Sequence, residues 1–65
     1  MRILVNGELR ECAAVTLQEA LDVLGYGGTV VATAVNEDFV PVSARADHPL
    51  AEGDRIEILA PMQGG

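Results

Sequence analysis

The stretch MRILVNGELREC, residues 1–12, decides how the rest of this chain folds. Its centre is Asn6-Gly7, the dipeptide that best accepts the positive φ angles of a two-residue hairpin turn. Residues that favour strands lie on both sides of this turn. We therefore predict two antiparallel strands, over residues 1–5 and 8–12.

The length of the turn also determines which side chains share a face. A two-residue turn puts Leu4 opposite Leu9 on one face and leaves Ile3 and Val5 on the other, which we expect to pack against the core. Leu4, Leu9 and, later in the chain, Leu59 could form an exposed patch where a partner docks. Neighbouring side chains could instead cover them in part, and the sequence leaves both interpretations open.

A helix is predicted to begin after Thr16, because Thr16-Leu17-Gln18-Glu19 has the pattern of a capping box. Apolar residues then recur at the spacing of one helix face, and Gly25 is well placed to end the helix in the left-handed conformation. The apolar stripe consists of Leu17, Ala20, Leu21 and Leu24.

Two further strands are indicated downstream of the helix. Residues 30–35 are rich in valine, threonine and alanine and lead into a turn at residues 36–38. A short strand should follow at Phe39-Val40, before Pro41 removes a backbone donor. Residues 43–50 show no clear period, so we expect an irregular connection with one helical turn at most.

The last strand is predicted over residues 55–59, where strict alternation places Ile56 and Ile58 on one face. A chain of 65 residues has room for one domain with a single modest core. The order strand, strand, helix, strand, short strand, strand then predicts an α+β fold of the β-grasp type. It has a mixed sheet of four to five strands, one main helix packed on one face, and the last strand beside the first in the middle.

The final residues, 60–65, offer chemistry that no internal segment can. Neither Gly64 nor Gly65 has a Cβ, so the free α-carboxylate of Gly65 is unhindered. Together with Met62 and Gln63, Gly64 would form a flexible carrier tail that reaches about 20 Å from the domain, at 3.3–3.6 Å per residue. The alternative is an ordinary frayed terminus.

Charge and composition restrict which partners, covalent links and cellular location we expect. The formal net charge of −6 is unfavourable for binding nucleic acid or an anionic membrane surface, so we expect neither partner. Cys12 is the single cysteine, which excludes an internal disulfide and favours a small buried core residue. Neither a signal peptide nor a membrane-spanning run is indicated, and we expect the protein in the cytoplasm.

In sequence order, several short stretches resemble the ThiS family, the ubiquitin-like sulfur carriers of thiamine biosynthesis. The resemblance covers the whole chain, residues 1–65, as one ubiquitin-like domain with 60–65 as its carrier tail. The matching stretches are Ile3-Leu4-Val5-Asn6-Gly7, Thr16-Leu17-Gln18-Glu19-Ala20-Leu21, Ala34-Val35-Asn36-Glu37, Val40-Pro41, Gly53-Asp54-Arg55-Ile56-Glu57-Ile58 and Gln63-Gly64-Gly65.

The resemblance implies a carrier that is a substrate of other enzymes and not itself a catalyst. A ubiquitin-activating-type adenylyltransferase would adenylate Gly65 with ATP and magnesium, so the carrier itself is expected to bind no cofactor. Sulfur derived from cysteine, delivered by a donor such as a cysteine desulfurase, would then give a C-terminal thiocarboxylate. Thiazole synthase would take that sulfur to build the thiazole part of thiamine.

Two positions depart from the family pattern. The family often has an arginine after Val40-Pro41 and an aromatic residue a few positions on, where this chain has Val42 and Arg45.

Two other functions remain open. One alternative function is that of the sulfur-carrying small subunit of molybdopterin synthase, and the presence of Pro61 in the tail is a point of resemblance to those subunits. The other is a ubiquitin-like protein modifier, or an interaction module that uses the sheet face and not the tail.

Overall fold

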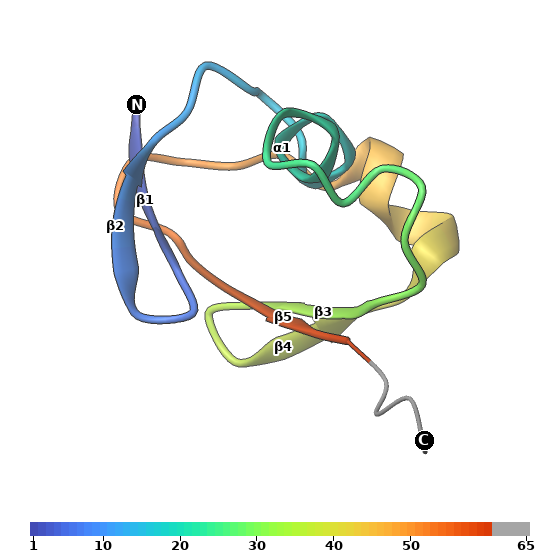
Figure 1. Ribbon diagram of the computed structural model, residues 1–65. Helices are drawn as coiled ribbons and strands as arrows, with labels where there is room; N and C mark the ends of the chain where they lie inside the picture. The colour runs from blue at the N-terminus through green and yellow to red at the C-terminus, as the bar shows by residue number, and fades with distance from the viewer. Residues whose placement is uncertain (61–65) are drawn as a thin grey trace.

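Five strands form one mixed sheet in the order β2-β1-β5-β3-β4 in the computed structural model, which describes residues 1–60 (Figure 1). The helix α1 packs across one face of this sheet, as predicted. The elements in chain order are β1 (Arg2–Val5), β2 (Glu8–Glu11), α1 (Leu17–Val23), β3 (Ala32–Val35), β4 (Asp38–Val40), the 3₁₀ helix η1 (Val42–Asp47) and β5 (Arg55–Leu59).

The first hairpin has the predicted turn and register. Asn6 and Gly7 take φ angles of 50° and 82°, the positive values that this turn requires. Leu4 lies opposite Leu9 across the antiparallel β1 and β2. Ile3 is fully buried, so the odd-numbered face of β1 packs on the core as expected.

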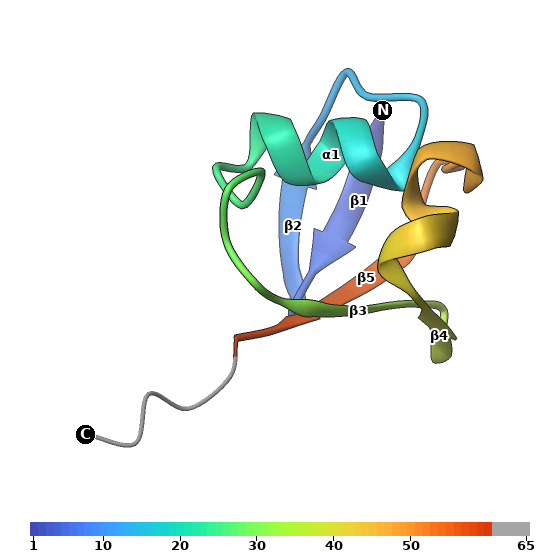
Figure 2. The same cartoon turned by 90° about the vertical axis from the view of Figure 1, so that its right-hand side faces the viewer.

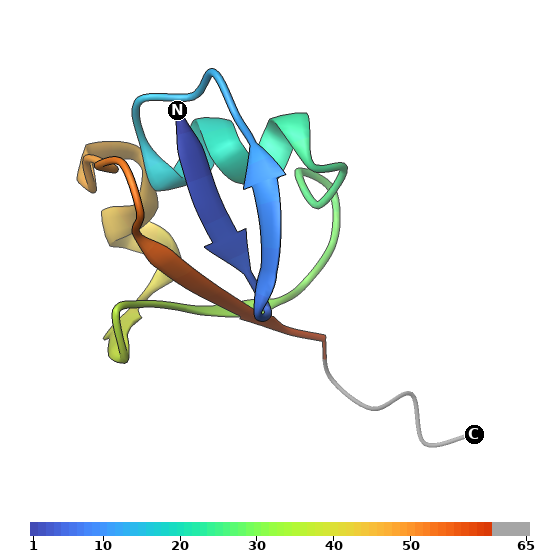
Figure 3. The ribbon, with the colours of Figure 1, turned by 90° about the vertical axis from the view of Figure 1, so that its left-hand side faces the viewer.

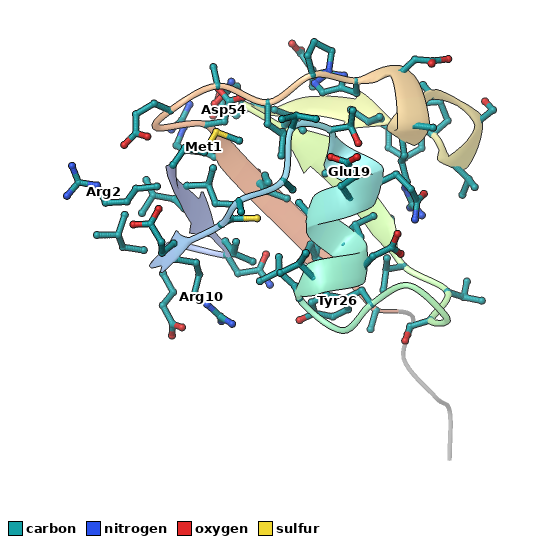
Figure 4. All side chains as sticks on the ribbon, turned by 90° about the horizontal axis from the view of Figure 1, so that it is seen from above. Met1, Arg2, Arg10, Glu19, Tyr26 and Asp54 are labelled. Atoms are coloured by element: carbon teal, nitrogen blue, oxygen red, sulfur yellow. The ribbon has the colours of Figure 1, made fainter. Side chains whose placement is uncertain are left out.

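The predicted capping box is formed in part at the start of α1: the Thr16 hydroxyl bond is present, but the Glu19 carboxylate bonds one residue before Thr16 and not to the Thr16 amide. The Thr16 hydroxyl accepts from the Glu19 amide at 3.2 Å, and the Glu19 carboxylate accepts from the Val15 amide at 2.9 Å. The Thr16 bond satisfies a backbone donor that the first helical turn leaves free, and the Glu19 bond ties the residue before the cap to the helix. Glu19 and Tyr26 mark the two ends of the helical region in Figure 4, and Gly25, with φ 94°, ends the helix as predicted.

The third strand is shorter than predicted. Residues 30–35 were expected to form it, but β3 begins at Ala32 and Val30 is 79% exposed. The reason lies in the partner strand, because Ala32 pairs with Leu59, the last residue of β5. Upstream of Ala32, β5 offers no further residue for the strand to pair with.

The connection between β4 and β5 is more regular than its sequence indicates. Residues 42–47 form the 3₁₀ helix η1, which follows Pro41 and lies beside α1 (Figure 2). The backbone amide of Leu17 then bonds to the carbonyl of His48 at 2.9 Å, which ties this connection to the start of α1. The single core lies between the sheet and these helices. It contains Ile3, Val5, Cys12, Ala14, Leu17, Ala20, Leu21, Val31, Val35, Val40, Ile56 and Ile58.

The amino group of Met1 gives a prediction for pH dependence. It bonds to the Glu11 carboxylate at 3.0 Å, and this hydrogen bond, together with charge attraction, raises the pKa of the amino group above its ordinary value of 8.0 against a smaller effect of burial. The folded chain thus binds this proton more tightly than the unfolded chain, so the stabilisation is complete below about pH 8 and is lost as pH rises through the raised pKa.

We therefore expect the melting temperature of the parent protein to fall slightly from neutral pH to about pH 10. Part of this fall should be missing in Glu11→Gln, which keeps the shape of the side chain but removes its charge. Thermal unfolding of both proteins across this range checks the prediction. Identical pH profiles for parent and variant would show that the pair contributes nothing.

Candidate functional site

Strand β5 occupies the middle of the sheet and carries the chain toward its C-terminal residues. It pairs in parallel with β1, where Val5 lies beside Ile56, and antiparallel with β3. Figures 2 and 3 show β5 crossing the molecule from the side of η1 to the opposite side, where Ala60 follows it. The predicted carrier residues, Met62, Gln63, Gly64 and Gly65, lie outside the described residues.

The sheet face turned away from α1 carries the three leucines proposed as a docking patch. Ile56 and Ile58 point into the core, so Leu59 and its alternating neighbours on β5 point outward. Leu9 is 61% and Leu59 is 69% exposed, whereas Leu4 is half-buried between its neighbours. All three lie on one face, as predicted.

These leucines do not form one contiguous patch. Leu4 pairs with Leu9 on one side and lies beside Arg55 on the other. Leu59 is four residues further along β5 than Arg55, a separation of about 13 Å at the usual rise of a strand. The structure therefore places Leu4 and Leu9 together and Leu59 elsewhere on the same face.

Leu59 has a different apolar neighbour, Phe39, which the sequence reasoning did not include. Phe39 is 69% exposed and lies opposite Ala34, and a shallow groove of about 110 Å³ runs between Phe39, Ala34 and Leu59. Alternation within Asp38-Phe39-Val40 was the available signal. Since Val40 is in the core, Phe39 had to point away from it.

Charged side chains separate the two apolar groups. A hollow of about 500 Å³ between the β1–β2 turn and the β3–β4 turn is lined by Leu4, by the cation Arg55 and by the carboxylates of Glu37 and Glu57. A partner that covers this face must offer apolar surface at two places and polar or charged groups between them. We name the outward set Leu4, Leu9, Phe39 and Leu59 the docking face.

The two positions that depart from the family pattern differ in their surroundings. Arg45 is only 6% exposed, and its guanidinium donates to the Thr33 hydroxyl at 3.1 Å and to the Val31 carbonyl. It therefore joins η1 to β3 and is not available to a partner. Val42 is 69% exposed and lies on the helix side of the molecule, away from the docking face.

Other candidate chemistry is limited within residues 1–60. Cys12 is 2% exposed and packs in the core, which confirms its interpretation as a buried apolar residue. No group of three histidine, cysteine, aspartate or glutamate residues is arranged to hold a metal ion in this part of the chain. None of its helices is long and apolar enough to cross a membrane.

A mixed five-stranded sheet, one main helix across it and a central last strand define a β-grasp domain of the ubiquitin-like class. In this chain the last strand leads to a C-terminal Gly-Gly. Residues 3–65 match the model of the ThiS family, and the chain belongs to that family. The predicted resemblance is thus confirmed.

Relatives support this assignment over nearly all of the chain. It is 39% identical over 61 residues to the sulfur carrier protein ThiS of Thermus thermophilus, which covers 94% of this chain and 95% of that protein. It is 35% identical over 66 residues to the sulfur carrier protein ThiS of Escherichia coli, with both chains covered completely. A thiazole synthase of Paramagnetospirillum magneticum is 36% identical over 66 residues, which span this whole chain but 20% of that protein.

Solved structures agree with the fold. The crystal structure of the thiamine biosynthesis protein ThiS from Geobacter metallireducens superposes with a TM-score of 0.84 at 25% sequence identity, and both chains are covered completely. The solution structure of a thiamine biosynthesis protein from the same organism gives a TM-score of 0.81 at 25% identity over 100% of this chain and 88% of that one. The predicted β-grasp fold is confirmed.

Proposed function

We propose that this chain is a sulfur carrier protein of thiamine biosynthesis that holds sulfur as a thiocarboxylate at Gly65. The observation that carries this proposal is the match of residues 3–65 to the ThiS family, which includes the terminal Gly-Gly. The geometry supports it, because β5, the central strand of the sheet, is the last element before the residues that would carry the sulfur. The chain is a substrate of its partners and not an enzyme.

The chemistry requires activation before sulfur can be accepted. A carboxylate is a poor electrophile until one of its oxygens becomes part of a good leaving group. In the proposed first step, an oxygen of the Gly65 carboxylate attacks the α-phosphorus of ATP on a ubiquitin-activating-type adenylyltransferase, and pyrophosphate leaves. Magnesium bound with the ATP would offset the phosphate charge. Neither ATP nor magnesium need bind to the carrier.

Sulfur enters in the second step. The terminal sulfur of a cysteine-derived persulfide, held on a donor such as a cysteine desulfurase, attacks the Gly65 carbonyl carbon. The bond from that carbon to the AMP oxygen breaks, and AMP leaves with the electron pair. A thiol then reduces the sulfur–sulfur bond that still joins carrier and donor, which releases the Gly65 thiocarboxylate and the donor thiolate while the reducing thiol is oxidised to a disulfide. Since Gly65 has no side chain, the attacked carbon is open to its reagents on both sides.

Thiazole synthase is the proposed acceptor of the sulfur. The similarity of this chain to a segment of a thiazole synthase supports that pairing, because a carrier and its acceptor are efficient when joined in one polypeptide. The docking face gives this chain a surface through which it could bind its partners one after another. We place the reaction in the cytoplasm, as the sequence predicts.

Intact-mass measurement tests the proposal and separates it from its alternatives. The chain is incubated with a ThiS-activating adenylyltransferase, ATP, magnesium, cysteine, a cysteine desulfurase and a thiol reductant. A sulfur carrier should gain the mass of one oxygen-to-sulfur exchange at Gly65. A protein modifier would appear instead as an isopeptide conjugate, and an interaction module that does not use its tail would keep its mass. Either of the last two results contradicts the proposal.

Substitutions on the docking face should weaken binding without unfolding the domain. We expect Phe39→Glu and Leu59→Glu each to raise the Kd for the adenylyltransferase about 30-fold, close to 2 kcal/mol, because each places a charge in an apolar contact. The free energy of unfolding should change by less than about 0.5 kcal/mol, since both side chains are 69% exposed.

The matched control for this binding experiment is Val23→Glu. Val23 is 66% exposed on α1, on the side of the molecule away from the docking face, so it adds the same charge elsewhere. Calorimetry or surface plasmon resonance gives the Kd values. An equal loss of affinity in Val23→Glu would attribute the effect to net charge and contradict the proposed docking face.

A further inference from the structure

The side chain of Asn6 pairs with strand β5 as if it were part of the backbone. Its Nδ2 donates to the Ile58 carbonyl at 3.1 Å, and its Oδ1 accepts from the Ile58 amide at 2.8 Å. Both bonds are partly buried and join residues 52 positions apart in the chain. The β1–β2 turn, which ends β1, thus remains attached to the last residues of β5.

The side-chain amide of Asn6 supplies two hydrogen bonds that the backbone of β1 does not make to Ile58. The regular pairing of β1 with β5 ends at Val5 and Ile56, and Asn6 turns away with a φ of 50°. In a continued parallel ladder the next carbonyl of β1 would accept from the Ile58 amide, and an amide two residues on would donate to its carbonyl. The Asn6 side chain supplies both an acceptor and a donor at this place.

Alternation along β5 explains why Ile58 depends on this side chain. Asn36 donates its backbone amide to the Arg55 carbonyl at 2.7 Å, so Arg55 and every second residue after it bond toward β3. Asn6 donates its backbone amide to the Ile56 carbonyl at 2.9 Å, so Ile56 and Ile58 bond toward β1. Within residues 1–60, the Asn6 side chain is the partner that the Ile58 backbone groups bond to on that side.

Ile58 packs in the core and immediately precedes the part of the chain that serves the proposed function. Leu59, the next residue, belongs to the docking face, and Ala60 begins the segment that leads to Gly65. We propose that Asn6 is a positioning residue that fixes the end of β5, so that a docked domain presents the Gly65 carboxylate in the orientation required for adenylation. This inference rests on the proposed adenylation of Gly65.

The chain contains a matched control for this role. Asn36 also has a φ of 50°, and its Oδ1 accepts from the Arg55 amide at 3.0 Å while its Nδ2 donates to Asp54 Oδ1 at 3.0 Å. It thus makes two similar side-chain bonds at the other end of β5, far from Ala60. Glycine at either position keeps the positive φ accessible and removes the side chain with its amide, and the added backbone freedom is the same in both variants.

The experiment compares Asn6→Gly and Asn36→Gly in steady-state adenylation, at a temperature where both variants and the parent are folded. We expect Asn6→Gly to lower kcat about tenfold while KM changes less than about threefold, because docking through Leu4, Leu9 and Phe39 is retained but the carboxylate is presented in the wrong place more often. For Asn36→Gly we expect kcat within about twofold of the parent. Asn6→Asp, which keeps an acceptor but loses the donor, should lie between and serves as the test if Asn6→Gly does not fold.

Amide hydrogen exchange gives a readout on the free chain. In Asn6→Gly the Ile58 amide should exchange at least about tenfold faster than in the parent, with the Ile3 amide unchanged. Equal losses of kcat in both glycine variants, or an unchanged kcat in Asn6→Gly, would overturn the positioning role. If the parent itself is not adenylated, the proposed function fails, whereas the exchange result still reports whether Asn6 holds Ile58.

Discussion

Deletion of Gly65 is expected to abolish adenylation while leaving the thermal unfolding of the domain unchanged. The shortened chain still ends in a glycine carboxylate, so the chemical group survives and only its position changes. Removing one residue withdraws that carboxylate by about 3.3–3.6 Å. A misplacement of even 1 Å can cost about 100-fold in rate at a reacting centre, so we expect a loss of at least that size.

We expect the fold to tolerate this deletion. Among residues 1–60 the last core residue is Ile58, and β5 ends at Leu59, six residues before Gly65. We expect the free energy of unfolding to change by less than about 0.5 kcal/mol. Pyrophosphate release with the adenylyltransferase and ATP measures the first step, and thermal unfolding followed by circular dichroism is the control. Adenylation of the shortened chain at the parental rate would contradict the role of Gly65.

Extension by one glycine after Gly65 should fail for the same reason in the opposite direction. The carboxylate then lies one residue beyond the position at which the adenylyltransferase and ATP are arranged to meet it. Agreement between the two changes would show that length, and not the loss of a particular glycine, determines activity. If extension is tolerated and deletion is not, the partner requires a minimum reach only.

Local sequence signals predicted most of the fold correctly. The Asn6-Gly7 turn, the Thr16 hydroxyl cap and the alternation around Ile56 each depend on residues close together in the chain, and the structure confirms all three. The central place of β5 beside β1 followed from the predicted β-grasp fold and agrees with these being the two most continuously apolar strands. Each of these signals involves residues within a few positions of one another, so the local structure that it predicts does not depend on distant pairing.

Features that depend on distant pairing were missed or only partly predicted. The start of β3 is set by where β5 ends, and the neighbour of Leu59 is set by how β3 and β4 pair. Arg45 was singled out as a departure from the family pattern, yet its burial depends on the 3₁₀ helix η1, which has no clear periodicity. The side-chain bonds of Asn6 to Ile58 likewise required knowledge of which backbone groups β1 leaves unpaired.

Leu21→Ala is expected to remove much of the stability of the domain. Leu21 is 1% exposed and packs between α1 and the sheet, and truncation of such a leucine costs about 3 kcal/mol through lost burial and the cavity left behind. The whole free energy of unfolding of a chain this size is about 3–10 kcal/mol. We therefore expect the melting temperature to fall by about 12–24 °C, at about 4–8 °C per kcal/mol.

Leu24→Ala is the matched control for Leu21→Ala, since it makes the same chemical change on the same apolar stripe. Leu24 is only partly buried at the end of α1, so its truncation should cost about 1 kcal/mol. Urea unfolding of both variants gives the two free energies, and adenylation of Gly65 per folded molecule should equal that of the parent in each. If the two truncations cost the same, the core does not extend from Leu17 to Leu21 as the structure places it. If Leu21→Ala instead lowers adenylation while folded, the helix side of the domain takes part in partner binding, and the docking face is not confined to the open face of the sheet.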